Sequence, residues 1–391
     1  MTPAELETLL ARSNYARRLI TAEPTLLHVV AALSTRALDR GGLSRLLSES
    51  TPPNDEPELA QRLRAARKRA LLSIMARDLS GRADLEEVMG SMTLLAETVL
   101  AFALPLLYQW QSANGVPQNP DGSGNMPLVV IAMGKFGSGE LNVSSDIDLI
   151  FAYPEDGEIA TARGLSHFEF FTRLARKLTG VLNESTADGF VFRVDTRLRP
   201  YGESGPLVAS FAMLENYYTC QGREWERYAW IKGRVVCGTA FEAELKSFMR
   251  PFVFRKYLDF GALASLRTLH AQIRAEVARR DLFDDIKRGP GGIREIEFIA
   301  QVFQLIRGGR DPALQIMPTL QVLTLLAQRN LLPEAAADEL TDAYRFLRRL
   351  EHRLQYFDDQ QTHRVPGGAE ARQSIAMMMG YVDYDTLAAA L

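Results

Sequence analysis

The chain has 391 residues, of which 47% are hydrophobic and 24% are charged, and its formal net charge is -3. This length predicts two or three domains, and the composition is that of an ordinary globular protein. The near-neutral charge excludes an overall electrostatic footprint for nucleic acid, and two cysteines are too few for a disulfide framework or a zinc cluster. We therefore expect no nucleic-acid partner and a reducing, cytoplasmic location.

Residues 1–125 are predicted to form an N-terminal helical region, because apolar residues recur there at helical spacing. The most apolar stretch, residues 92–110, is interrupted by Glu97 and Pro105. It therefore predicts a buried helix rather than a membrane span, and we expect no membrane partner. A segment rich in Asn, Gly and Pro, residues 111–127, separates these helices from the first clear strand.

Residues 126–240 are predicted to form the catalytic domain, in which strands and helices alternate. Strands are expected at residues 128–133, 146–154 and 189–199, and an amphipathic helix at residues 167–186.

Residues 241–391 are predicted to form a C-terminal helical bundle, with helices at 262–280, 291–309 and 338–360. The acidic segment "REIEF" (294–298) is expected to be a helix face that pairs internally and serves structure. The chain ends inside a helical pattern, which we expect of a piece of a longer protein. The fold class is therefore predicted as α+β, with a mixed-sheet domain between two helical domains.

Two aspartates in the second predicted strand are the first candidate site residues. Side chains alternate along a strand, so Asp146 and Asp148 project from one face while Ile147 and Leu149 enter the core. Paired carboxylates stay ionised most easily around a divalent cation, and their hard oxygen atoms suit Mg²⁺ or Mn²⁺. The alternative is a turn or N-cap at the strand end, which the apolar residues after them disfavour.

A third carboxylate lies in the next predicted strand, "FRVDTRLRP" (192–200). Asp195 alternates there with arginines, so it is a candidate third metal ligand, and Arg197 and Arg199 are candidate phosphate contacts. The alternative is a salt bridge between Asp195 and one of these arginines, which would leave the arginines as ordinary solvated charges.

The turn "GKFGSGE" (134–140) directly follows the first strand, so its backbone N–H groups are expected to approach a phosphate. Lys135, Gly137 and Ser138 are the candidate phosphate contacts of this turn. No Walker loop or dinucleotide-binding fingerprint is present.

Two further cations, Lys232 and Arg234, lie in the aromatic segment "WERYAWIKGRVV" (225–236). They are candidates to reach a phosphate from a helix or its end. The alternative is an aromatic core with snorkelling cations.

A strand, a Gly-Ser turn, an Asp-x-Asp strand and a distant Asp on another strand together resemble the nucleotidyltransferase superfamily related to DNA polymerase β. In that superfamily the turn holds a phosphate, and metal ions on the aspartates organise in-line attack at phosphorus.

A closer resemblance is carried by residues 132–154, 192–236, 250–260 and 289–315. These segments resemble the bacterial bifunctional glutamine synthetase adenylyltransferase/adenylyl-removing enzymes, whose members are about twice this length and contain two related halves. "GELNVSSDIDLIF", "YGESGPLV" and "WERYAWIKGRVV" are most similar to the N-terminal, adenylyl-removing half, and the start at Met1 agrees.

The resemblance implies a reaction and partners. In the implied reaction, inorganic phosphate attacks the AMP group on a tyrosine of adenylylated glutamine synthetase and releases ADP. Asp146 and Asp148 correspond to the family's metal ligands, with Asp195 as the third. The implied partners include the signal-transducing PII protein and the C-terminal adenylyltransferase half. Three alternatives remain open: adenylyl transfer in the forward direction, nucleotide transfer to RNA or a small molecule, and a non-catalytic nucleotide-sensing module.

Overall fold

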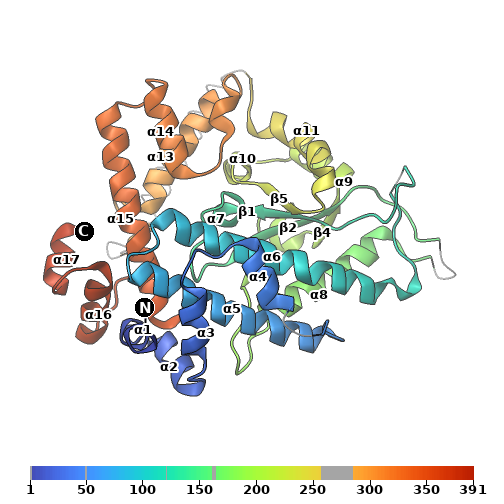
Figure 1. Ribbon diagram of the computed structural model, residues 1–391. Coiled ribbons are helices and arrows are strands. Elements are labelled where there is room, and N and C mark those ends of the chain that lie inside the picture. The colour runs from blue at the N-terminus through green and yellow to red at the C-terminus, as the bar shows by residue number, and fades with distance from the viewer. Residues whose placement is uncertain (1, 49–50, 120, 161–163, 257–284) are drawn as a thin grey trace.

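The computed structural model describes residues 2–48, 51–119, 121–160, 164–256 and 285–391 (Figure 1). They form a mixed α+β protein with helices before and after a small sheet, as the predicted fold class requires. The DNA polymerase β-like arrangement and the domain boundaries at 125/126 and 240/241 stay predictions.

The N-terminal part of the chain is helical, as predicted. Its helices are α1 (Pro3–Leu10), α2 (Asn14–Ala22), α3 (Leu26–Leu33), α4 (Arg40–Ser48), α5 (Glu56–Leu79) and α6 (Leu85–Gln111). The two long helices begin at aspartates, Asp55 and Asp84, whose side chains accept hydrogen bonds from the backbone of the first turn. In the described part of the chain, α6 is the one helix long and apolar enough to cross a membrane. It packs against α4, α5 and α8 (His167–Asn183) in the largest hydrophobic core, as predicted for a buried helix.

Within the described residues the sheet has five strands, β1 (Val129–Met133), β2 (Ile147–Tyr153), β3 (Val194–Asp195), β4 (Val208–Ser210) and β5 (Arg234–Cys237). Their order is β3-β2-β1-β5, with β4 also beside β2. The central strand β1 is antiparallel to β2 and β5, whereas β3 and β4 run parallel to β2. The strands predicted at 128–133 and 146–154 are confirmed.

The strand predicted at 189–199 is wrong except for Val194–Asp195. The chain leaves the edge of β2 after these two residues and returns to it only as β4. Tyr201 and Gly202, with φ of 61° and 58°, turn the backbone between the two contacts into the left-handed region, which no extended strand adopts. Alternation in sequence therefore did not correspond to a continuous strand here.

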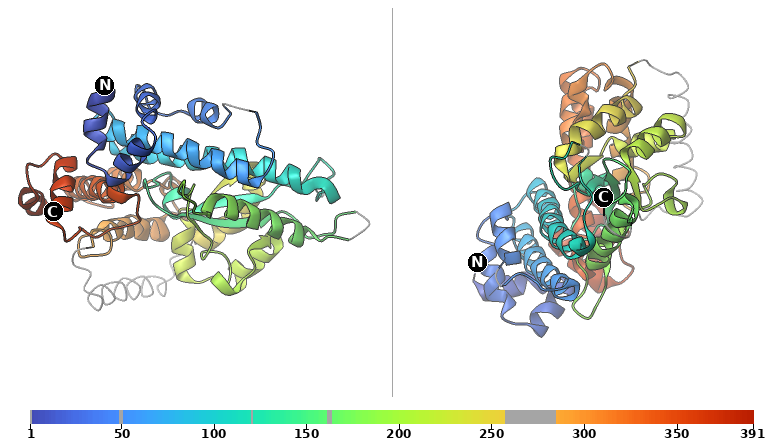
Figure 2. Two further views of the ribbon diagram at one scale, coloured as in Figure 1. Left: turned by 90° about the horizontal axis from the view of Figure 1, so that it is seen from below. Right: turned by 90° about the vertical axis from the view of Figure 1, so that its right-hand side faces the viewer.

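Both faces of the sheet are covered by helices (Figure 2). Val130, Leu149 and neighbouring side chains face α5, α6 and α8, the last of which begins at a capping box and confirms the helix predicted at 167–186. Ile131 and Ile150 face the opposite way, toward α9 (Phe211–Cys220), α10 (Glu224–Trp230) and α11 (Glu242–Val253). A sheet buried on both sides leaves the ends of its strands as places for a polar site.

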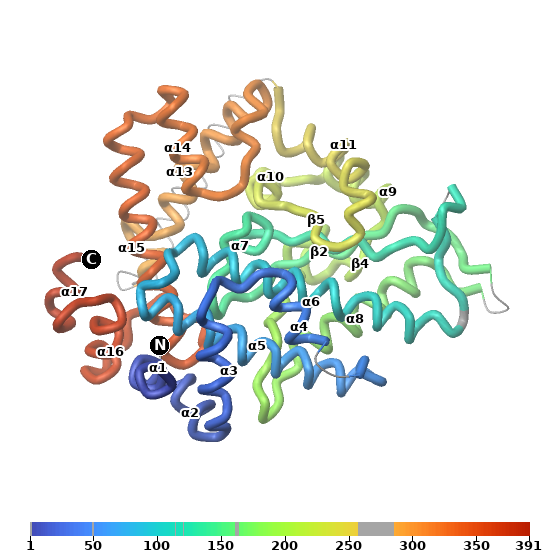
Figure 3. Tube along the Cα trace, viewed as in Figure 1, coloured from blue at the N-terminus to red at the C-terminus, as the bar shows by residue number. Residues whose placement is uncertain are grey.

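The C-terminal helices form a third core. They are α13 (Ile293–Arg307), α14 (Thr319–Gln328), α15 (Glu334–Asp358), α16 (Ala369–Met379) and α17 (Tyr384–Ala390). Helices predicted at 291–309 and 338–360 are confirmed, and the one predicted at 262–280 lies outside the described residues. The long helix α15 runs from α14 to the N-terminal helices, where it packs against α2 and α6 (Figure 3). It therefore ties the C-terminal helices to the N-terminal ones.

Candidate active site

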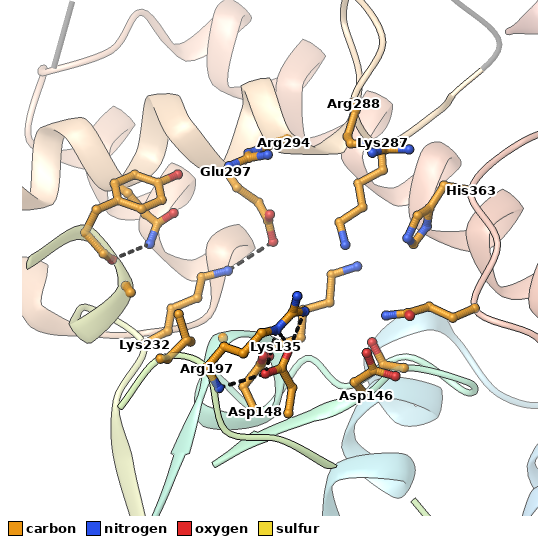
Figure 4. Close-up of a pocket in the computed structure, with 18 residues that line it drawn as sticks. Lys135, Asp146, Asp148, Arg197, Lys232, Lys287, Arg288, Arg294, Glu297 and His363 are labelled. Atoms are coloured by element: carbon orange, nitrogen blue, oxygen red, sulfur yellow. Dashed lines mark hydrogen bonds and ion pairs between the residues drawn. The ribbon is translucent and has the colours of Figure 1, made fainter. Parts of the chain in front are cut away.

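A cavity of about 540 Å³ lies where the sheet meets the C-terminal helices (Figure 4). This volume is within the range of small-molecule sites, about 300–1,000 Å³. One wall comes from the sheet and its adjoining turns, and the other from α13, the loop before it and the loop after α15. The predicted site residues that line it are Lys135, Asp146, Asp148, Asp195, Arg197 and Lys232.

Asp148 occupies the centre of the acidic wall. It lies on β2, paired in register with Asp195 of β3 on one side and Met133 of β1 on the other. Gly134, at φ 55°, makes room for it, because a Cβ there would lie 2.8 Å from the Asp148 Oδ2 atom. Burial, followed by the charges of Asp195 and Asp146, raises the pKa of Asp148 to about 7. Asp146 and Asp195 thus act electrostatically on Asp148.

The other two aspartates each contact an arginine. Arg193 Nε donates to Asp146 Oδ1 at 2.8 Å, and the same guanidinium reaches the carbonyl of Ser144 at 2.5 Å. Arg197 Nε donates to Asp195 Oδ2 at 2.9 Å, and its backbone N–H donates to Oδ1 at 2.8 Å. Burial opposes ionisation of Asp195, but these bonds from Arg197 lower its pKa. The salt bridge considered as the alternative for Asp195 is therefore present.

The ion pairs of Asp146 and Asp195 bear on whether the three aspartates could bind a metal ion. Within the residues that the structure describes, no three His, Cys, Asp or Glu side chains are grouped as a metal site requires. Arginines supply the positive charge beside Asp146 and Asp195 instead. The donor atoms nevertheless fit Mg²⁺ or Mn²⁺, since all are carboxylate oxygens lining one cavity.

The two predicted lysines line the cavity but have partners of their own. Lys135 Nζ bonds both carboxylate oxygens of Glu351, at 2.9 and 2.8 Å. Lys232 Nζ bonds Glu297 at 3.0 Å and Glu140 at 3.4 Å. The acidic segment at 294–298 was predicted to pair within its own helix, and this is wrong for Glu297, which pairs with a residue of the sheet domain.

Gly137 and Ser138 of the turn do not line the cavity. A Cβ at Gly137 would lie 1.7 Å from the carbonyl oxygen of Lys232 and 2.5 Å from that of Ala132, so a glycine is required for backbone packing. Ser138 is buried, and its hydroxyl donates to the carbonyl of Lys135 at 3.3 Å. The turn forms the one-turn helix α7 (Gly134–Gly137), whose first two residues line the cavity.

Arg199 and Arg234 also lie away from the cavity. The Arg199 guanidinium donates to the carbonyl and hydroxyl oxygens of Thr196, each at 2.8 Å. These bonds stabilise the loop between β3 and β4. Arg234 pairs with Glu97 of α6 at 2.7 Å and donates to the carbonyl of Gly137 at 2.9 Å. Both guanidiniums are engaged in structural contacts, so their positions do not support phosphate binding.

The opposite wall carries residues that sequence reasoning did not select. They come from the loop before α13, from α13 itself and from the loop after α15. They are Lys287, Arg288, Arg294, Glu297, Gln301, Gln361 and His363. The segment "KRGPGGIR" (287–294) concentrates basic residues and glycines, which is the signal that would have identified the first three.

Two family models match the chain. Residues 4–247 match the model described as glutamate-ammonia ligase adenylyltransferase, and residues 267–390 match the model described as GlnD PII-uridylyltransferase. The first match covers the sheet, the acidic wall and the N-terminal helices.

Several curated proteins named bifunctional glutamine synthetase adenylyltransferase/adenylyl-removing enzyme are similar to nearly the whole chain. The protein of Nitrosomonas eutropha is 51% identical over 97% of this chain and 41% of its own length. The protein of Burkholderia pseudomallei is 50% identical over 99% of this chain and 44% of its own length. The protein of Nitrosococcus oceani is 54% identical over 88% of this chain and 36% of its own length. The chain thus spans about two fifths of the length of these relatives.

Proposed function

Because the chain belongs to the glutamate-ammonia ligase adenylyltransferase family, we propose that it catalyses nucleotidyl chemistry on glutamine synthetase, and specifically removes AMP from adenylylated glutamine synthetase. The observation that carries this proposal is the convergence of Asp146, Asp148 and Asp195 on one cavity whose opposite wall is basic. A carboxylate cluster facing cations is suited to a phosphate ester bound with a divalent ion.

Removal, rather than addition, is supported by the resemblance of three segments to the adenylyl-removing half of the family. The relatives are named for both activities, and the chain matches about 40% of their length. Addition of AMP is the second candidate, because the matching family model is described as an adenylyltransferase. A DNA polymerase β-like arrangement of the sheet is part of the same proposal.

Asp146 and Asp148 would hold Mg²⁺ or Mn²⁺, with Asp195 as the third ligand. A bound ion of this kind supplies charge stabilisation to the phosphoryl oxygens during displacement at phosphorus. Arg197 lies beside this acidic wall with its guanidinium largely exposed, which supports the proposal that it contacts a phosphate oxygen. Gly134 keeps the wall open, since any side chain there would contact Asp148.

The proposed reaction is a phosphorolysis. An oxygen of hydrogen phosphate attacks the AMP phosphorus, and the bond from that phosphorus to the tyrosine oxygen breaks. The new bond makes the anhydride of ADP, and the proton of the hydrogen phosphate passes to the tyrosine oxygen. The cavity, at about 540 Å³, is of a size for a nucleotide and the attacking phosphate.

The C-terminal helices are proposed to contact the PII protein. The support is the match of residues 267–390 to a family model described as PII-uridylyltransferase. The second half of the full-length enzyme is the other proposed partner.

The test is incubation of the chain with adenylylated glutamine synthetase, inorganic phosphate and Mg²⁺, with ADP as the measured product. We expect Asp146→Asn to reduce ADP release about a thousandfold or more, which corresponds to about 4 kcal/mol of transition-state stabilisation. The matched control is Asp188→Asn, an exposed carboxylate that pairs with Lys68 outside the cavity. Release of AMP would indicate hydrolysis, and incorporation of AMP from ATP would favour the second candidate.

A further inference from the structure

Six cations line the described part of the cavity, and they fall into two groups. Four of them have carboxylate partners: Lys135 with Glu351, Arg197 with Asp195, Lys232 with Glu297, and Arg288 with Asp285. The remaining two, Lys287 and Arg294, make no side-chain hydrogen bond or ion pair within the residues that the structure describes. The positive charge of the cavity that has no directly bonded carboxylate among the described residues is therefore on these two.

The backbone places Lys287 and Arg294 side by side. The Arg294 N–H donates to the carbonyl of Lys287 at 3.0 Å, and the N–H of Ile293 donates to the carbonyl of Ile286 at 3.1 Å. Gly292 allows this close approach, because a Cβ there would lie 2.8 to 2.9 Å from three carbonyl oxygens of the same loop. The backbones of Lys287 and Arg294 are thus held together at the start of α13, and both side chains line the cavity.

The buried carboxylate of Asp285 holds the loop before α13 in place. Its Oδ1 accepts from the backbone N–H groups of Lys287 and Arg288, at 3.1 and 2.9 Å, and its Oδ2 accepts from the Arg288 guanidinium at 2.8 and 2.7 Å. Asp285 is therefore occupied, and it does not neutralise the Lys287 ammonium. Figure 4 shows Lys287 and Arg294 on the wall opposite Asp146 and Asp148.

We propose that Lys287 and Arg294 form a phosphate-binding subsite, separate from the aspartates, that holds the inorganic phosphate which attacks the AMP phosphorus. The attacking role rests on the proposed phosphorolysis, whereas binding of phosphate does not. A free phosphate dianion is repelled by the three carboxylates and attracted by the two cations across the cavity. An arginine and a lysine together match its charge, with the arginine suited to bidentate contact.

The test is binding of inorganic phosphate to the full 391-residue chain, measured by equilibrium dialysis with labelled phosphate. We expect Lys287→Gln and Arg294→Gln each to weaken phosphate binding about tenfold or more, as loss of a charge-assisted hydrogen bond does. The matched control is Arg307→Gln, an exposed arginine on the same helix and outside the cavity, which should bind like the wild type. Equal binding by wild type and Lys287→Gln, or no binding by the wild type, would overturn the proposal.

A second arm measures ATP binding to the same variants. A loss confined to inorganic phosphate supports a site for the attacking group, whereas a loss confined to ATP would overturn it, because the subsite would then hold the nucleotide's outer phosphates. Asp148→Asn separates this inference from the proposed function. It should abolish turnover yet keep phosphate binding, so failure of catalysis and failure of the subsite give different results.

Discussion

The cavity and the contact between α15 and the rest of the chain both contain carboxylates facing cations, but they differ in how far each charge is shielded from water. We call the second region the α15 junction. Its buried polar side chains on α15 are Arg348, Glu351, His352, Arg353 and Gln355, each at most 1% exposed. In the cavity, by contrast, Arg197 is largely exposed and Asp146 and Asp195 are only partly shielded.

The charged groups of the α15 junction have specific partners. Arg353 forms two contacts with Asp78 of α5, and the Tyr356 hydroxyl donates to the same carboxylate at 2.8 Å. Burial alone would raise the pKa of Glu351, but Lys135 and Arg348 hold it well below its usual range. Arg348 also donates to the carbonyl of Glu140 at 2.7 Å.

The cavity keeps its charges less well compensated. Three carboxylates lie together on one wall, while the side chains of Lys287 and Arg294 make no hydrogen bond or ion pair within the described residues. Such an arrangement opposes folding slightly and favours a ligand that completes it. The comparison therefore separates charges that hold the fold together from charges available for chemistry.

The largest expected effect comes from breaking the α15 junction. Asp78→Asn leaves the buried Arg353 guanidinium without its counter-charge, and removal of one partner from a buried pair costs about 3–5 kcal/mol. The free energy of unfolding, measured by urea denaturation, should fall by that amount.

The control for this change is Arg345→Gln on the same helix. Arg345 pairs with Glu86 at the surface, where both side chains are more than 40% exposed, so the loss should stay below about 1 kcal/mol. Similar losses in the two variants would contradict the view that buried pairing holds the junction.

The pH dependence of stability tests a second property of the α15 junction. Burial, followed by the charge of Arg348, lowers the pKa of His352 to about 3, below the value near 6.5 of an unfolded histidine. Below about pH 6.5 His352 therefore binds a proton in the unfolded chain but not in the folded chain. The free energy of unfolding falls as the pH drops below this value.

His352→Gln removes this titration. Between pH 7 and pH 5 the wild type should lose about 2 kcal/mol more unfolding free energy than the variant, at about 1.4 kcal/mol for each pH unit below 6.5. Other buried acids of the junction are present in both chains, so their contributions cancel in the difference. Parallel pH profiles would show that folding does not lower the pKa of His352.

Sequence reasoning located the elements whose pattern is local. Strands β1 and β2 and helices α8, α13 and α15 are continuous runs of one periodicity, so neighbouring residues alone specify them. The predicted strand at 189–199 failed because its partner is the edge of β2, which only two residues of that segment reach before Tyr201 and Gly202 turn the chain away.

The part of the site that lies within local sequence patterns was likewise predictable. Asp146 and Asp148 are carboxylates one residue apart before an apolar run, and the register of β2 with β3 brings Asp195 beside Asp148. The basic, glycine-rich segment at 287–294 marks Lys287 and Arg294 in the sequence. That they face the aspartates across one cavity follows only from the packing of the C-terminal helices, which no local pattern describes. Conversely, Arg199 and Arg234 have suitable charge in sequence, but folding gives them structural partners.

The last expected effect is a gain rather than a loss, and it belongs to the cavity. Burial and two neighbouring carboxylates raise the pKa of Asp148 to about 7, so its ionised form opposes folding at pH 8. Asp148→Asn removes that charge at almost constant volume, and without divalent ions it should raise the free energy of unfolding by up to about 4 kcal/mol, because each unit of upward pKa shift corresponds to about 1.4 kcal/mol. Mg²⁺ should then stabilise the wild type but not the variant, because the carboxylate proposed to hold the ion is gone. A destabilised variant, or equal stabilisation of both chains by Mg²⁺, would place Asp148 with the structural charges of the α15 junction and end the distinction between the two regions.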